Sequence, residues 1–111
     1  MSAAETLVVF VTTPSVDEGQ TIARSLVRDR LAACVNVVPG IRSVFFWEGR
    51  VQEETEALLV IKTRRERYEA LQGRILELHT YSVPEVLALR VEAGSPAYLA
   101  WVRETACAGG G

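Results

Sequence analysis

The chain has 111 residues, of which 49% are hydrophobic and 23% charged, so we expect one domain that buries a core. Its net charge of −2 and the lack of a basic block argue against nucleic acid or an anionic membrane as the partner. No apolar run reaches the about 18 residues of a membrane span. We predict a single domain over residues 1–106 and a disordered, Gly-rich tail over 107–111.

The chain start and the cysteines indicate where the protein works. The N-terminus lacks the positive flank of a signal peptide. Two cysteines, Cys34 and Cys107, are too few for a disulfide framework. We therefore expect free thiols and a cytoplasmic location.

The first predicted elements are a strand and a helix. Leu7–Val11 is a continuous apolar run and predicts a buried strand. Ser15 and Glu18 have the spacing of a capping box, so a helix is expected to start there. Its apolar face consists of Ile22, Ala23, Leu26, Val27 and Leu31.

Residues 34–63 predict one long β-hairpin. Glu48-Gly49 suits a two-residue turn, and if Trp47 pairs with Arg50 each arm has about 14 residues, against about 5–6 in an ordinary strand. Pro39-Gly40 predicts a bulge in the first arm. The arms are apolar only at their base, so the distal half should project and meet solvent or a second subunit.

The rest of the chain predicts helix, strand and helix. Thr63 and Glu66 have capping-box spacing, and the helix after them should end near His79. A short strand over 86–91 and a helix starting at Ser95-Pro96 follow. The apolar positions of the two helices are Tyr68, Leu71, Ile75 and Leu78, and then Tyr98, Leu99, Trp101 and Val102.

This element order predicts an α+β fold, the ferredoxin-like βαββαβ sandwich, with a long central β-hairpin and an extra C-terminal helix. Two helices on one face of the sheet leave the other face bare. The extra helix or a neighbouring subunit should cover that face.

Several stretches together resemble the CutA family of divalent-cation tolerance proteins. They are Thr12-Thr13-Pro14, Arg30–Asn36 with Pro39-Gly40, Trp47-Glu48-Gly49 with Ile61-Lys62-Thr63, His79–Glu85, and Tyr98, Leu99 and Trp101. The resemblance implies cytoplasmic homotrimers with an architecture similar to PII signalling proteins. It also implies a link to tolerance of copper and other divalent metals, without an established enzymatic reaction.

Two residues are candidate metal ligands. His79 matches a family histidine, although Thr80 replaces the proline after it, and imidazole is a common copper or zinc ligand. The Cys34 thiolate would suit Cu(I). The alternatives are a solvated histidine at a helix C-terminus and a cysteine that packs in the core. Copper or another divalent cation is the candidate cofactor, and folding should not require it.

Aromatic and acidic residues indicate two further sites. Phe45, Phe46, Trp47 and Trp101 are candidates for a trimer interface, with a ligand-stacking platform at Trp47 as the alternative. The resemblance places Lys62, Tyr81, Glu85 and Trp47 in a pocket between subunits; a structural ion pair between Lys62 and Glu85 is the alternative. Four hairpin acids, Glu48, Glu53, Glu54 and Glu56, either collect cations loosely or form a solvated strand face.

Together these features predict a cytoplasmic homotrimer that serves divalent-cation tolerance. Its partners are copies of itself and metal ions. The alternative is a PII-like small-molecule sensor or regulatory scaffold with ligand clefts between subunits. A catalytic Ser-His-Asp or His/Cys cluster is not evident in the sequence, so we do not expect an enzyme.

Overall fold

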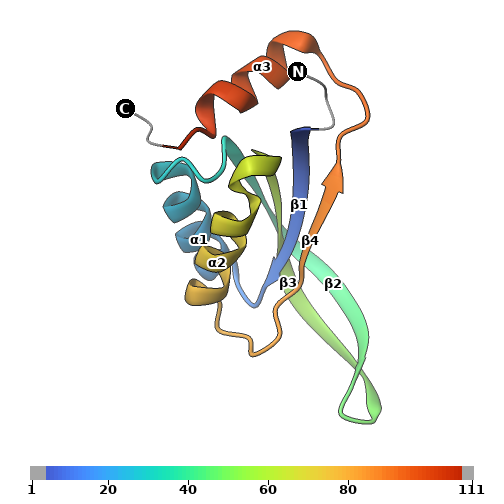
Figure 1. The fold of residues 1–111 in the computed structure, drawn as a ribbon. Coiled ribbons are helices and arrows are strands. Elements are labelled where there is room, and N and C mark those ends of the chain that lie inside the picture. The colour runs from blue at the N-terminus through green and yellow to red at the C-terminus, as the bar shows by residue number, and fades with distance from the viewer. Residues whose placement is uncertain (1–4, 109–111) are drawn as a thin grey trace.

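A four-stranded antiparallel sheet organises the structure, a computed structural model that describes residues 5–108 (Figure 1). The strand order is β2-β3-β1-β4, and α1 and α2 lie on the same face of the sheet. The element bounds are β1 (Thr6–Thr13), α1 (Val16–Arg28), β2 (Cys34–Trp47), β3 (Arg50–Arg64), η2 (Arg65–Arg67), α2 (Tyr68–Leu78), β4 (Val86–Arg90) and α3 (Pro96–Thr105). This topology confirms the predicted α+β, ferredoxin-like fold of the protomer.

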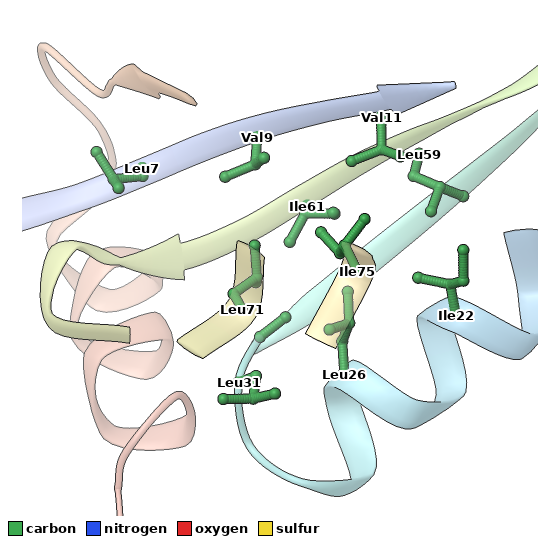
Figure 2. Close-up of a cluster of buried hydrophobic side chains, with 11 residues drawn as sticks. Leu7, Val9, Val11, Ile22, Leu26, Leu31, Leu59, Ile61, Leu71 and Ile75 are labelled. Atoms are coloured by element: carbon green, nitrogen blue, oxygen red, sulfur yellow. The ribbon is translucent and has the colours of Figure 1, made fainter. Parts of the chain in front are cut away.

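The core lies between the sheet and these two helices (Figure 2). Side chains alternate between the two faces of a strand, so every second residue of β1 and β3 points toward the helices. Burying each large apolar side chain contributes about 1.5–3 kcal/mol. The buried residues are Leu7, Val9, Val11, Ile22, Leu26, Leu31, Ala32, Leu59, Ile61, Leu71 and Ile75.

The opposite sheet face carries an apolar surface that α1 and α2 do not cover. The same alternation places there the residues Val8 and Phe10 of β1, Val38 of β2, Leu58 and Val60 of β3, and Leu87 and Leu89 of β4. We call this set the open face. Leu87 and Leu89 are more than half exposed, and α3 crosses only the end of the sheet near the start of β1 (Figure 1).

The hairpin has the predicted length, turn and bulge. β2 and β3 have 14 and 15 residues and pair as far as Trp47 opposite Arg50. Glu48 and Gly49 both have positive φ, 53° and 80°, as a type I′ turn requires. The register shifts at Pro39-Gly40, where Gly40 has a φ of 72°. Figure 1 shows the distal half curving beyond the rest of the sheet, and the longest dimension of the described chain is 45 Å.

Two predictions about the helices are wrong in detail. Thr63 does not cap a helix, because β3 continues past it and its hydroxyl donates to the Leu31 carbonyl at 2.7 Å. α2 starts only at Tyr68, after the short turn η2. The apolar stripes are also only partly buried, since Val27, Leu78, Tyr98 and Trp101 are exposed.

The remaining features concern the thiols, the tail and the helix lengths. Both cysteines are free, as predicted. The predicted tail falls partly outside the described residues, which end at Ala108. Within residues 5–108, every helix is too short or too polar to cross a membrane.

Two helical glycines give opposite stability predictions. An alanine Cβ at Gly73 would meet no atom within 4 Å, so Gly73→Ala should raise the free energy of unfolding by about 1 kcal/mol. A Cβ at Gly19 would lie 3.0 Å from Thr13 Oγ1 and 3.1 Å from Leu59 Cδ2, so Gly19→Ala should gain less or lose stability. Urea unfolding at one protein concentration measures both, and equal gains would contradict this packing.

Candidate functional site

A cavity of about 700 Å³ opens between the distal half of the hairpin and the segment that leads into β4. We call it the acidic pocket. Because side chains alternate between the two faces of each hairpin arm, one face of each arm points toward the acidic pocket. Its lining residues are Thr12 and Pro14, Ser43, Val44, Phe45 and Trp47 of β2, Gln52, Glu54 and Glu56 of β3, and Tyr81, Ser82, Val83 and Glu85.

Glu56 is the central charged group of the acidic pocket. The residue is only 7% exposed, and its Oε2 accepts a hydrogen bond from the Tyr81 hydroxyl at 2.7 Å. Burial, this hydrogen bond and the surrounding carboxylates raise the pKa of Tyr81, so the phenol stays protonated and donates. The hydroxyl that donates to Glu56 is therefore a neutral partner and supplies no positive charge to the acidic pocket.

The neighbouring carboxylates reinforce this negative charge. Burial, followed by the charge of Glu56, raises the pKa of Glu85 above its usual range. Glu54 lines the same cavity. Over residues 5–108, none of these three acids forms an ion pair with an arginine or lysine.

His79 holds the segment that carries Tyr81. Its side chain is fully buried, with Nε2 2.7 Å from the Thr12 carbonyl oxygen and Nδ1 accepting from the Tyr81 N–H at 3.1 Å. These partners fit a neutral ring with its proton on Nε2. The alternative of a solvated histidine is therefore wrong, and a metal ion could reach the ring only by replacing one of these hydrogen bonds.

Glu18 holds Thr80, the residue that follows His79, in place. Ser15 accepts from the Glu18 N–H at 3.1 Å, which confirms the first half of the capping box. The Glu18 carboxylate instead accepts from the Thr80 N–H at 3.1 Å and the Thr80 hydroxyl at 2.9 Å. α1 and β1 thus both hold the start of the segment that forms one wall of the acidic pocket.

Cys34 and Lys62 lie at the opposite end of the sheet. They pair directly across β2 and β3, and the Lys62 ammonium donates to the Asn36 side chain. Cys34 is half-buried beside Tyr98, whose pKa is raised by burial and by this thiol. Six strand residues, or about 20 Å, separate Lys62 from Glu56.

Within one protomer the structure therefore brings together only part of the predicted pocket. Tyr81, Glu85 and Trp47 line one cavity, and Lys62 does not. The prediction that Lys62 joins them across a subunit boundary stays a prediction. Within one protomer, no set of three or more His, Cys, Asp or Glu donors converges in the part of the chain described, so metal binding by His79 and Cys34 stays a prediction.

The four predicted interface aromatics are all exposed but do not form one surface. Phe45 and Trp47 face the acidic pocket, whereas Phe46 points to the other face of the hairpin, opposite Val51. Trp101 stacks obliquely on Tyr98 of α3, with ring centroids 5.6 Å apart. Their role in a trimer stays a prediction.

Sequence reasoning missed the burial of Glu56 and the roles of Glu18 and Thr12. The sequence did contain one signal for the burial of Glu56. This residue directly precedes the apolar run 57–61, and it shares a strand face with Leu58. Glu53 fits the solvated alternative instead, because it is exposed and pairs with Arg42 at 3.4 Å.

The fold and the acidic pocket define a class of small ferredoxin-like proteins with a cavity beneath a projecting hairpin. The model of the CutA1 divalent ion tolerance family matches residues 7–105. The chain therefore belongs to that family.

Individual relatives agree with this assignment. The divalent-cation tolerance protein CutA of Thermus thermophilus is 47% identical over 97 residues, which cover 87% of this chain and 94% of the relative. The chloroplastic protein CutA of Arabidopsis thaliana is 48% identical over 99 residues, which cover 89% of this chain and 54% of the relative. The chain thus spans about half the length of that relative.

Solved structures show the same fold. The divalent cation tolerance protein Cut A1 from Thermus thermophilus superposes with a TM-score of 0.88 at 46% identity, covering 90% of this chain and 97% of its own. CutA from Synechococcus elongatus gives a TM-score of 0.90 at 34% identity, covering 96% and 95%.

Removing the His79 ring should loosen the wall of the acidic pocket. His79→Ala leaves the Thr12 carbonyl and the Tyr81 N–H without partners, which should cost about 1–3 kcal/mol of unfolding free energy. Amide hydrogen exchange at Tyr81 should speed up. Glu77→Ala, at an exposed position of the same helix, is the control. Unchanged stability together with lost copper binding would restore His79 as a ligand.

The carboxylate at Glu85 should make stability depend on pH. Since its pKa is raised in the folded state, the ionised form is disfavoured there relative to the unfolded chain. The penalty is complete above the folded pKa and vanishes below the unfolded one. Glu85→Gln should therefore stabilise at pH 7, with the gain lost below about pH 4. Urea unfolding at both pH values measures this, and destabilisation at pH 7 would contradict it.

Proposed function

We propose that this protein serves divalent-cation tolerance as a cytoplasmic homotrimer. Membership of the CutA1 family supports the role in tolerance. The open face supports self-association, because large exposed apolar patches mark interaction surfaces. The two free cysteines favour a reducing compartment.

The trimer arises because one protomer cannot cover its own apolar surfaces. Leu87, Leu89 and Val38 remain exposed on the open face. Phe46 and Val51 remain exposed on the outer face of the projecting hairpin, at 70% and 65%. In a closed trimer each protomer meets two neighbours, which together would bury both surfaces and bring further side chains toward the acidic pocket.

The metal response does not need a tight site in a single protomer. No converging donor set is found among residues 5–108, and both ring nitrogens of His79 are engaged. Copper or another divalent cation would meet carboxylates at the acidic pocket, where hard oxygen donors bind cations loosely. Non-enzymatic action fits the relatives, which are named as tolerance proteins.

A second candidate function is a PII-like sensor or regulatory scaffold that binds a small molecule. The acidic pocket is the observation that favours it, because its size and its mixture of apolar and polar walls are those of a ligand site. Under this alternative, cation tolerance follows indirectly from the sensing or regulatory role of the protein.

Two solution measurements test the proposal. Light scattering should give a mass of about 37 kDa, three times the 12.2 kDa protomer, and a monomer would overturn the assembly. In calorimetry, Cu²⁺ or Zn²⁺ should bind with modest affinity, and Glu56→Gln should weaken that binding about tenfold. Glu53→Gln, on the other strand face, should not. Weakening by Glu53→Gln instead would place the cations elsewhere.

A further inference from the structure

We propose that residues 80–84 form a lid on the acidic pocket, closed by a latch at Glu18 that has two positions. With the lid shut, the state that predominates, the Glu18 carboxylate holds Thr80. When the lid opens, the same carboxylate moves to the Ser15 N–H and completes the capping box. Movement of this wall is a property beyond the proposed function, since it does not depend on what the pocket binds.

The lid lacks the backbone hydrogen bonds that hold a helix or a strand. Among residues 5–108, residues 80–84 make no backbone-to-backbone hydrogen bond, because they lie between the end of α2 and the start of β4. Tyr81, Ser82 and Val83 line the acidic pocket, and Val83 is 71% exposed. Segments with few buried apolar contacts open locally at a lower free energy than the core. The lid can therefore open while the core stays folded.

Each hydrogen bond that holds the lid in the described part of the chain involves a side chain. The Thr80 N–H and hydroxyl donate to the two carboxylate oxygens of Glu18, at 3.1 and 2.9 Å. The Tyr81 N–H donates to His79 Nδ1 at 3.1 Å, and the Tyr81 hydroxyl donates to Glu56 Oε2 at 2.7 Å. Opening breaks this last contact, so it withdraws Tyr81 from the hairpin and uncovers the Glu56 carboxylate.

A second partner for the Glu18 carboxylate is already in place. In a capping box, the side chain of the third helical residue accepts from the N–H of the capping residue. Ser15 caps α1 and accepts from the Glu18 N–H, but the exposed Ser15 N–H has no hydrogen-bond partner within residues 5–108. A change of rotamer lets Glu18 exchange the two Thr80 donors for this N–H. The exchange recovers part of the hydrogen bonding that opening loses.

The latch lies on the helical side of the sheet (Figure 1). Glu18 lies in the first turn of α1, and Thr80 follows the end of α2. Both helices pack on the sheet face opposite the open face. The latch therefore lies outside the open face, where neighbouring copies are proposed to pack.

Amide hydrogen exchange on the full chain in its native assembly tests the lid. The protection factor of the Tyr81 amide should be at least tenfold lower than that of Ile61 in β3, because the lid opens without global unfolding. Low concentrations of urea should speed exchange at Ile61 and leave Tyr81 unchanged, since local opening exposes little surface. Equal protection of the two amides would mean that the segment opens only with the whole protein, and the lid would be disproved.

Two substitutions test both positions of the latch. Thr80→Val removes the hydroxyl donor and keeps the N–H, so protection of the Tyr81 amide should fall about tenfold. Glu18 should then shift toward Ser15, whose amide proton should exchange more slowly and move downfield in the NMR spectrum. Glu18→Ala removes both positions, so Tyr81 should lose at least as much protection while Ser15 gains none. Asp17→Ala removes an exposed charge from the same helical turn and should leave both amides within about twofold.

The Ser15 amide distinguishes a latch with two positions from a fixed clamp. If Thr80→Val loosens Tyr81 while the Ser15 amide keeps its wild-type shift and exchange rate, Glu18 has one position only and the proposal is wrong. Unchanged protection of Tyr81 in Glu18→Ala would refute it as well. Neither the mass of the assembly nor its affinity for cations enters these measurements, so failure of the latch and failure of the proposed function are distinguishable.

Discussion

The register of β3 is the constraint on which the rest of the structure depends. β3 pairs with β1 over its second half and with β2 from Arg50 to Lys62, with a bulge between. Side chains alternate, so a slip of one residue would exchange the two faces. Leu59 and Ile61 would then leave the core, and Glu56 would leave the acidic pocket for the helices. The register that builds the core therefore also places the charge of the pocket.

The features set by local chemistry were predictable from the sequence. The turn at Glu48-Gly49, the bulge at Pro39-Gly40 and the arm lengths all depend on nearby residues, and all were found. The capping box at Thr63 was wrong because a distant carbonyl, that of Leu31, takes its hydroxyl. Tertiary partners of this kind have no signature in a local pattern.

The candidate site was predictable in composition but not in geometry. Tyr81, Glu85 and Trp47 were expected to share a pocket, and they do so within one protomer. Lys62 was expected to join them across a subunit boundary, and within one protomer its register opposite Cys34 and Val8 places it at the far end of β3. The burial of His79 could not be read either, because it depends on the Thr12 carbonyl, 67 residues earlier in the chain.

The arrangement around Glu56 is better explained by function than by stability. Among residues 5–108 of the protomer Glu56 has no counter-charge, which is destabilising for a buried carboxylate, and an apolar residue at that position would extend the surface of Leu58 and Val60 at no such cost. The chain instead fixes the neighbouring wall through His79 and Glu18, and it provides Tyr81 as a neutral donor. A pocket that is rigid and negatively charged before any ligand arrives loses little entropy when a cation binds. The hairpin that lines this pocket also projects beyond the rest of the sheet, so the proposed cation response and the proposed self-association depend on the same element.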